Sequence, residues 1–434
     1  MVNAVAKYQK YAEYKDSGVE WLGEIPSHWK VTRLKFLAKI KNGQDYKHVE
    51  AENGYPVMGS GGQFTFSKEY MFDKPSVLLG RKGTIDKPLF IDEPFWTVDT
   101  MYYTDVQKEI DVKYFYYLAK TILFDRYSTN TALPSMTQEN LNNFEFAIPH
   151  DIGERQSIRS FLDHETAKID SLIEKQQKLI ELLKEKRQAV ISHAVTKGLN
   201  PDVPMKDSGV EWLGRVPEHW TVSKFGYISQ VVRGGSPRPA GDPTLFNGDY
   251  SPWVTVAEIT KDNELYLTST ETFLTKKGSE QCRVFTKGTL LLSNSGATLG
   301  VPKILCIDAN ANDGVVGFED LKIDTEYAYF YLSVLTNDLR ERVKQGSGQP
   351  NLNTDIVKAI SITIPPENEI KEIVADIKNK IEHFAKLMQS AENAIQLMQE
   401  RRTALISSAV TGKIDVGYCQ YRNFINVAQM ELRQ

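Results

Sequence analysis

The residues best suited to chemistry in this chain form polar, glycine-rich loops rather than a catalytic constellation. The sequence contains no GxxxxGK[ST] phosphate loop, no HExxH pair, no CxxC pair and no Gly-x-Ser-x-Gly elbow. For His28 and His219, which lie in a repeated loop, packing or hydrogen bonding is the expected role. Cys282, Cys306 and Cys419 lie far apart, which indicates no disulfide framework and fits a reducing compartment. The sequence therefore predicts no catalytic residue and no bound metal ion.

Glycine-rich polar loops follow strand-like runs in both halves of the chain. Arg and Lys side chains can bond guanine O6 and N7, Asn and Gln can bond adenine N6 and N7, and Ser, Thr and backbone N–H groups suit phosphate oxygens. Each loop alone is more simply explained as an ordinary turn, but loops at matching positions in both halves favour a binding surface. The candidate DNA contacts are Ser60, Gly61, Gly62, Arg81, Lys82, Thr84, Asn130, Thr131, Ser135 and Thr137 in the first half, and Arg233, Ser236, Arg238, Ser293, Asn294, Ser295, Lys344, Gln345, Gln349 and Asn351 in the second.

One block of sequence occurs twice and organises the rest. KDSGVEWLG, at 15–23, recurs letter for letter at 206–214, and EIPSHWKV (24–31) becomes RVPEHWTV (215–222). A single offset of 191 residues aligns all of these positions. A period this long is not that of a solenoid or a propeller, so the sequence predicts two copies of one large unit.

After each repeated block comes a region of short strand-like segments. Runs of Val, Leu, Tyr, Phe and Thr bounded by glycine or proline, such as SVLLGRKGTI at 76–85, predict strands. Apolar residues at helical spacing predict one helix at 113–127 and another at 326–344. We therefore expect an α+β head in each half, and we call residues 31–150 the first head and residues 222–366 the second head.

The two heads share only traces of sequence. LLGRKGT (78–84) resembles LLSNSGA (291–297), and ALPSMTQENLNNFEFAIP (132–149) resembles GQPNLNTDIVKAISITIP (348–365). A closely repeated framework that carries two diverged heads suggests one geometry used to present two different specificities.

Each head is followed by a long run with a heptad pattern. From about Glu154 to Thr196 there is neither Pro nor Gly, and a helix of this length would extend roughly 60 Å at ~1.5 Å per residue. An offset of 215 residues aligns KRQAVISHAVT (186–196) with RRTALISSAVT (401–411). An apolar stripe needs a partner, so we expect the two helices to pack antiparallel against each other. The predicted seam residues are Leu162, Ile169, Ile173, Ile180, Leu183 and Val190 in the first helix, and Ile370, Val374, Ile377, Ile381, Phe384, Met388, Ala391, Ile395, Met398 and Leu405 in the second.

Composition sets limits on the partners of the chain. Apolar residues make up 41% and charged residues 25%, which is ordinary for a globular protein. The net charge of −4 is not that of a free-standing DNA-binding protein, so affinity for nucleic acid must come from local patches or from a basic partner. No apolar run approaches the length of a membrane span, and the N-terminus lacks the apolar core of a signal peptide. We therefore expect a cytoplasmic protein with no membrane partner.

The WLG-x-[IV]-P-x-H-W block, the R-x-G-T-like turn and the helix end R-x-A-[VL]-I-S-x-A-V-T together resemble the specificity subunit of type I restriction-modification enzymes, over residues 15–415. The resemblance implies two mixed α/β target recognition domains separated by two long antiparallel coiled-coil helices, an α+β fold with a pseudo-two-fold internal repeat. The implied segments are a lead-in with the first WLG block (1–30), the first head (31–150), a central helix (151–198), the second WLG block (199–221), the second head (222–366), a C-terminal helix (367–415) and a tail (416–434).

The resemblance also implies partners. Each head would read one half of a split, asymmetric sequence in double-stranded DNA, and the helices would set the spacing between the half-sites. Two methyltransferase subunits would dock on the helices and adjoining loops, and restriction-translocation subunits would attach through them. S-adenosylmethionine, ATP and Mg would be used by those partners, with none bound by this chain. The expected partner-binding residues are Trp21, Leu22, Trp29, Trp212, Leu213, Trp220, Arg187 and Arg402.

Two other interpretations remain open at the level of sequence. The chain could be a coiled-coil scaffold whose heads bind proteins, in which case the purified complex would not retain DNA in a sequence-dependent way. It could instead be an enzyme that acts on DNA through an unrecognised site, which metal-dependent cleavage by the chain alone would favour.

Overall fold

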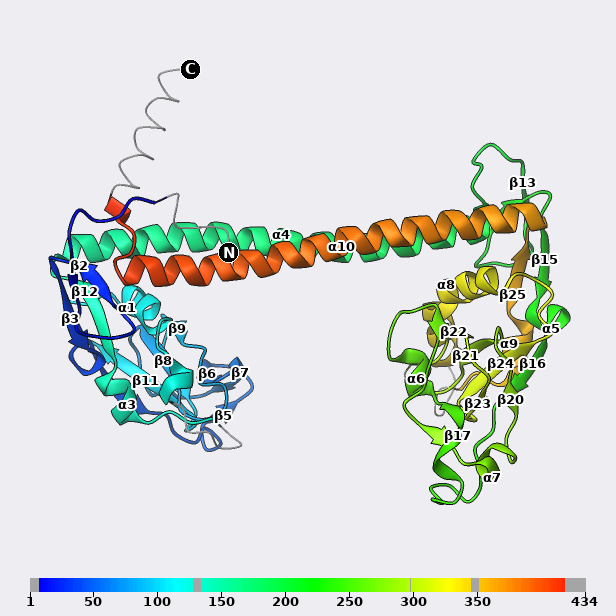
Figure 1. Cartoon of the computed structure of the whole chain (residues 1–434), viewed down its shortest axis with the longest axis horizontal. Helices are drawn as coiled ribbons and strands as arrows, with labels where there is room; N and C mark the ends of the chain where they lie inside the picture. The colour runs from blue at the N-terminus through cyan, green and yellow to red at the C-terminus, as the bar shows by residue number, and fades with distance from the viewer. Residues whose placement is uncertain (1–7, 128–133, 297, 345–350, 418–434) are drawn as a thin grey trace. The chain divides into compact units, whose positions relative to one another are not determined.

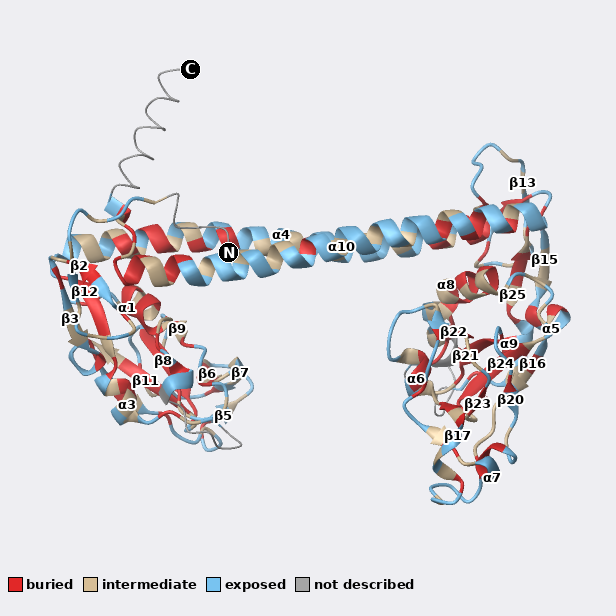
Figure 2. Ribbon diagram, viewed as in Figure 1, coloured by how far each residue is buried: buried red, intermediate tan, exposed pale blue. Residues whose placement is uncertain are grey.

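The computed structural model describes residues 8–127, 134–296, 298–344 and 351–417 (Figure 1). It divides into two compact units: unit 1 comprises residues 1–177 and 392–434, and unit 2 comprises residues 178–391. Each unit contains one head together with segments of two long helices. In each unit the buried residues gather within the head and where the head meets the helices (Figure 2).

The two long helices are α4 (Ile152–Lys197) and α10 (Glu367–Val410), which confirms the helices expected from the heptad pattern. All sixteen predicted seam residues are buried or half-buried. In unit 1, Leu162 near the start of α4 shares a core with Leu405 near the end of α10. In unit 2, Val195 near the end of α4 shares a core with Ile370 near the start of α10. Within each unit the two helix segments therefore run antiparallel.

The head of unit 1 is built on two four-stranded sheets, ordered β4-β11-β8-β9 and β10-β6-β7-β5, and on the pair β3–β12, while β1 pairs with β2 before the head begins. The strands are β1 (Tyr14–Asp16), β2 (Glu24–Pro26), β3 (Trp29–Arg33), β4 (Ala38–Asn42), β5 (Glu50–Ala51), β6 (Tyr55–Gly59), β7 (Gly62–Ser67), β8 (Ser76–Gly80), β9 (Leu89–Ile91), β10 (Trp96–Thr97), β11 (Met101–Val106) and β12 (Glu145–Pro149). The short helices are η2 (Leu34–Phe36), α1 (Val112–Ala119), α2 (Phe124–Tyr127) and α3 (Gln138–Asn143).

The head of unit 2 also has two sheets and a pair of strands, β15–β25, while β13 pairs with β14 before the head begins. Its first sheet, β16-β24-β21-β22-β18, repeats that of unit 1 with an additional strand, and its second sheet is ordered β19-β17-β23-β20. The strands are β13 (Met205–Asp207), β14 (Arg215–Pro217), β15 (Thr221–Lys224), β16 (Gln230–Arg233), β17 (Phe246–Val254), β18 (Tyr266–Leu267), β19 (Phe273–Leu274), β20 (Val284–Phe285), β21 (Leu290–Ser293), β22 (Pro302–Leu305), β23 (Ala309–Ala311), β24 (Val315–Glu319) and β25 (Ser361–Ile364). The helices are α5 (Phe225–Ile228), α6 (Val256–Thr260), α7 (Lys276–Ser279), α8 (Thr325–Lys344) and α9 (Thr354–Ala359).

The two helices expected in the heads have different outcomes. Helix α8 confirms the helix predicted at 326–344. The helix predicted at 113–127 is wrong as one element, because it is divided into α1 and α2. The amide and the hydroxyl of Thr121 both donate to the carbonyl of Leu118, at 2.9 and 2.7 Å, and this closes the first helix. The turn lets both Ile122 and Phe124 enter the core.

A carboxylate in the first turn of each long helix holds the repeated His-Trp pair. In unit 1, Glu154 accepts hydrogen bonds from the indole of Trp29 at 2.9 Å and contacts Nε2 of His28 at 3.0 Å. In unit 2, Glu369 accepts from Trp220 at 3.0 Å and contacts His219 at 2.8 Å. The hydrogen-bonding role expected for the two histidines is thus confirmed.

Replacing Glu369 by alanine should lower the free energy of unfolding by about 1.5–3 kcal/mol, because the buried Trp220 indole would lose a charged acceptor. Urea denaturation of the purified chain measures the loss. The matched control is Glu367→Ala, which removes an exposed carboxylate from the same helical turn and should change stability by well under 1 kcal/mol. Equal effects of the two substitutions would contradict this account.

The end of each long helix closes on the WLG block of its own unit. Lys197, at the end of α4, donates to the carbonyls of Leu213 and Arg215, and Lys413, after α10, donates to those of Leu22 and Glu24. Burial lowers the pKa of both lysines. The order of glycine and lysine is reversed between the two helix ends, KG against GK, yet both lysines reach equivalent carbonyls.

A glycine beside each of these lysines packs against the fully buried Trp. Gly198 and Gly412 have φ values of 77° and 72°, which favour glycine. A Cβ on Gly198 would lie 3.2 Å from the Trp220 ring, and one on Gly412 would lie 2.3 Å from Pro26. The helix ends, the WLG blocks and the two tryptophans therefore form one packed framework in each unit.

Candidate nucleic-acid interface

In unit 1 the turn after the central strand β8 contacts the segment that leads into α3. Lys82 forms a β-bridge with Ser135, and the amide of Met136 donates to the carbonyl of Arg81 at 3.0 Å. Thr137 then caps α3 by accepting from the amide of Asn140. The first-head residues Arg81, Lys82, Ser135 and Thr137 therefore lie together.

Unit 2 has the same arrangement built from different residues. Ser295, in the turn after β21, forms a β-bridge with Asn351, and the amide of Leu352 donates to the carbonyl of Asn294 at 2.7 Å. Asn353 caps α9 by accepting from the amide of Ile356. The two short stretches that resemble each other between the heads, 78–84 with 291–297 and 132–149 with 348–365, therefore meet in space in each unit. We call the place where they meet the turn cluster of that head.

A further turn lies beside each cluster, at the end of β4 in unit 1 and of β16 in unit 2, and one strand separates each of these from the cluster strand β8 or β21. In unit 1 the amide of Gly43 donates to Met101, and in unit 2 the amide of Gly234 donates to Val315, at 3.0 and 2.9 Å. A Cβ would lie 2.0 Å from a carbonyl oxygen at Gly43 and 2.3 Å from one at Gly234, so both positions require glycine. The side chain of Gln138 in the first cluster donates to that of Asn42 at 3.0 Å.

The residues beside Gly43 were missed by sequence reasoning. Asn42 and Gln44 are exposed and lie at the offset of 191 residues from Arg233 and Gly235. The offset of 191 residues that aligns the WLG blocks also aligns Asn42 with the predicted contact Arg233, so it could have indicated these residues. Their amide groups suit adenine edges as well as those of the predicted residues do.

The arginines of the clusters are oriented by backbone carbonyls. Arg81 donates to the carbonyl of Asp99 at 3.2 Å, with its guanidinium 5.9 Å from the centre of the Tyr102 ring. Arg233 donates to the carbonyl of Asp313 at 2.7 Å, and the carboxylate of Asp313 accepts from Ser236 at 2.8 Å. These contacts hold the guanidinium groups at the edge of each head, where they can meet a base or a phosphate.

The remaining predicted DNA contacts lie outside these two turn clusters. Ser60 and Gly61 form the turn of the β6–β7 hairpin, and Gly62 begins β7, where it pairs with Gly59. The carbonyl of Met58 in β6 accepts from the amide of Val98. Thr84 is exposed after the Arg81 turn, and Arg238 is exposed in a loop tied to Gln281. Asn130, Thr131, Gln345 and Gln349 lie outside the described residues, and only the backbone of Lys344 is described.

Two of the predicted contact side chains are buried. Ser293 has no exposed surface and bonds Thr298 and Val301, so its hydroxyl stabilises the turn and the prediction of a DNA contact is wrong. Asn294 is also fully buried, and within the described structure neither its amide oxygen nor its amide nitrogen has a hydrogen-bond partner. As it stands, the side chain of Asn294 cannot touch a ligand, which corrects that prediction too.

The partner-binding predictions need a similar correction. Trp29, Trp220, Leu22 and Leu213 are between 0 and 4% exposed, so a partner would not reach these four side chains. They belong to the framework core because the helix ends pack over them. The other four predicted residues are half-buried: Trp21, Trp212, Arg187 and Arg402. Their partner-binding role stays a prediction. Arg402 pairs with Asp170 at 2.9 Å.

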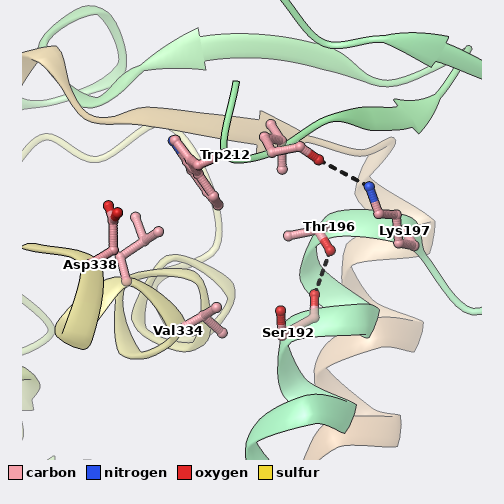
Figure 3. Close-up of a pocket in the computed structure, with 8 residues that line it drawn as sticks. Ser192, Thr196, Lys197, Trp212, Val334 and Asp338 are labelled. Atoms are coloured by element: carbon pink, nitrogen blue, oxygen red, sulfur yellow. Dashed lines mark hydrogen bonds between the residues drawn. The ribbon is translucent and has the colours of Figure 1, made fainter. Parts of the chain in front are cut away.

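The half-buried Trp212 borders a pocket of about 320 Å³ in unit 2 (Figure 3). The end of α4 contributes Ser192, Thr196 and Lys197, and α8 contributes Val334 and Asp338. The ring of Trp212 also meets that of Tyr331 edge-on at 6.0 Å. The WLG block of unit 2 therefore packs between α4 and helix α8 of the head.

The described ranges offer neither a metal centre nor a membrane span. No group of three or more His, Cys, Asp or Glu side chains in them is placed to hold a metal ion. No helix in the same ranges is long and apolar enough to cross a bilayer.

Comparison with known proteins identifies the family. The type I restriction modification DNA specificity domain is recognised twice, at residues 26–182 and 217–397, which together cover more than half of the chain. The chain belongs to the type I restriction-modification DNA specificity family. Its role is therefore DNA sequence specificity, and the family match does not support the alternative of a protein-binding scaffold without DNA recognition.

Individual relatives agree with this assignment to the specificity family. The MjaVIII specificity subunit of Methanocaldococcus jannaschii is 23% identical over 90% of this chain and 94% of the relative. The MjaIX specificity subunit of the same organism is 25% identical, but over only 43% of either chain. Among solved structures, a chain from a study of complex assembly and conformational transition in a type I R-M system has a TM-score of 0.68 at 14% identity, covering 89% of this chain and 98% of that one. The HsdS subunit from Thermoanaerobacter tengcongensis has a TM-score of 0.51 at 13% identity over 90% and 98%. The structural likenesses concern the fold.

Proposed function

We propose that this specificity chain is the non-catalytic DNA-reading subunit of a cytoplasmic type I restriction-modification complex, and that each head reads one half of a split, asymmetric DNA site. The observation that carries the proposal is the turn cluster present in both heads with different side chains. Lys82 and Ser135 in the first head stand where Ser295 and Asn351 stand in the second. One backbone arrangement with two sets of side chains suits two unlike half-sites.

The proposal retains the predicted heads at 31–150 and 222–366 and the candidate contacts in their loops, with the corrections made above. It also includes an antiparallel coiled coil of α4 and α10 that sets the spacing between half-sites and a pseudo-two-fold relation between the repeats. The offset of 215 residues that aligns the seams of the two helices supports this part.

Exposed leucines support docking of two methyltransferase subunits on the helices. Leu172 and Leu182 of α4 are 49% and 50% exposed, outside the seam. The offset of 215 residues places Leu387 and Leu397 of α10 at the same positions, with exposures of 40% and 65%. Unit 1 thus carries Leu172 and Leu397, and unit 2 carries the equivalent pair, as expected if one partner binds twice.

The remaining parts of the proposal concern the partners. Restriction-translocation subunits would attach through the methyltransferase subunits, and S-adenosylmethionine, ATP and Mg would be used by those subunits. The absence of catalytic motifs in the sequence supports a division of labour in which this chain supplies recognition alone.

Co-expression with a cognate methyltransferase subunit, followed by single-molecule sequencing of the host DNA, tests the proposal. We expect methylated adenines within a split motif that has two unlike halves. A single palindromic motif would contradict the assignment of one half-site to each head. No methylation from a complex that also fails to bind DNA would contradict the function itself.

Arg233→Ala should weaken binding of the cognate duplex by the complex about 5- to 150-fold, because a guanidinium that bonds a base or phosphate contributes about 1–3 kcal/mol. Fluorescence anisotropy with cognate and scrambled duplexes measures the change. Arg283→Ala is the matched control, because Arg283 is an exposed arginine of the same head that pairs with Glu319, at the opposite end of β24. If both variants bound DNA as the wild type does, Arg233 would not belong to the interface.

A further inference from the structure

One aromatic side chain in each unit projects into solvent at the equivalent position of the head. Phe36 is 65% exposed and Tyr227 is 75% exposed, and the two residues are related by the offset of 191 residues. An aromatic ring left in water forgoes the free energy of burying its apolar surface. The recurrence of such a ring in both units indicates a contact that each unit makes separately.

The surrounding backbone fixes the position of both rings. Phe36 ends η2, and Leu34, two residues earlier, is fully buried, with its amide donating to the carbonyl of Phe144 at 2.9 Å. Tyr227 lies in α5, where Phe225 is fully buried and its amide donates to Ile360 at 3.0 Å. Each ring is therefore presented from a rigid turn, and binding it would cost little conformational entropy.

The two rings also share basic surroundings, although the lysines come from different places in the chain. Nζ of Lys35 lies 5.3 Å from the centre of the Phe36 ring. Tyr227 borders a groove of about 490 Å³ that is also lined by Lys322, Lys358 and Asp320. A Cβ at residue 226 would lie 2.9 Å from Cβ of Lys358, so glycine there makes room for that lysine. Each ring is thus an apolar knob beside positive charge.

These features favour a protein surface over DNA as the occupant. Phenylalanine has no polar atom, so the chemistry common to both units is the ring and not the tyrosine hydroxyl. Asn42 and Arg233, in the DNA-facing clusters, each lie six residues further along the chain, along β4 or β16, which at about 3.3 Å per strand residue is at most roughly 20 Å. The side chains of those clusters differ between the heads, whereas the knobs are alike. A partner that is identical at both units meets this requirement.

We propose that Phe36 and Tyr227 anchor the two methyltransferase subunits, one at each unit, by inserting into an apolar pocket with an acidic rim on the partner. The proposal rests on the function proposed above and adds a contact within each head to the docking surface on the helices. Buried aromatic residues commonly dominate the affinity of protein interfaces.

Native mass spectrometry and calorimetric titration with the cognate methyltransferase subunit test the proposal. Phe36→Ala and Tyr227→Ala should each weaken one of the two binding events by about tenfold or more, and the double variant should weaken both. Tyr227→Phe should bind as the wild type does, because the ring is retained. Tyr70→Ala and Tyr250→Ala are matched controls, because they remove rings that are 47% and 59% exposed elsewhere on the two heads.

Three results would overturn the inference. Unchanged binding of two methyltransferase subunits by the double variant would show that the knobs are not anchors. Normal assembly with weakened DNA binding would assign the rings to DNA. A wild-type chain that binds no methyltransferase subunit would overturn the proposed function and this inference with it, and this outcome is distinct because it does not depend on the substitutions. Melting curves of the variants confirm that each chain is folded.

Discussion

Exchanging residues 34–144 for the matching segment of a specificity subunit with another target should change one half of the methylated DNA motif and leave the other half as it was. The amide of Leu34 donates to the carbonyl of Phe144, which is the point where the first head meets its two-stranded neck of β3 and β12. A boundary at 31 and 149 would cut through this pair of strands. The exchange at 34 and 144 keeps the whole neck with the framework.

The equivalent exchange in unit 2 provides the matched experiment. There the amide of Phe225 donates to the carbonyl of Ile360, beside the neck of β15 and β25. Exchange of residues 225–360 should alter only the other half of the motif. Methylome sequencing of hosts that carry each chimera reads out both halves directly. A chimera that changed both halves at once would contradict the assignment of one half-site to each head.

Asp262→Ala should destabilise the second head by about 3 kcal/mol, because it leaves a buried ammonium group without a counter-ion. Lys303 lies in β22 and is only 1% exposed, and its Nζ pairs with the carboxylate of Asp262. We take the lower end of the range for a broken buried pair because Asp262 is itself 38% exposed. Thermal unfolding of the variant at neutral pH measures the loss.

The same pair predicts a dependence on pH. The hydrogen bond from Lys303 lowers the pKa of Asp262, so its stabilising contribution is present above the unfolded pKa of an aspartate, about 4, and is lost as the pH falls through the folded pKa. The difference in melting temperature between the wild type and Asp262→Asn should therefore shrink below about pH 4. Lys303→Met, which removes the buried charge itself, should cost less than Asp262→Ala. A cost as large as that of Asp262→Ala would mean that the pair, rather than the unpaired ammonium, accounts for the loss.

Much of the framework could be predicted because it depends on local periodicity and on repetition. The spacing of Leu162, Ile169 and Ile173 alone requires one apolar face along a long helix, and two helices with seams in the same phase satisfy each other. The offset of 191 residues likewise pairs Trp29 with Trp220 on residue identity alone. These features follow from residue type and spacing, so they need no knowledge of which segments meet.

Other features depend on contacts between segments far apart in the chain. Sequence reasoning assigned Trp29 to a partner surface, but the end of α10 buries it in unit 1, with Gly412 packed on its ring. It also assigned Ser293 to the interface, whereas the hydroxyl bonds within its own turn.

The candidate DNA interface could be predicted only in part from the sequence. The loops were found, but their pairing across more than fifty residues, as in Lys82 with Ser135 and Ser295 with Asn351, was not. Periodicity and residue identity are local properties, so the residue order is enough to predict a duplicated framework with long helices and two different heads. Burial depends on the neighbours that folding brings to each residue, so the set of polar side chains that reach solvent could be read only from the folded chain.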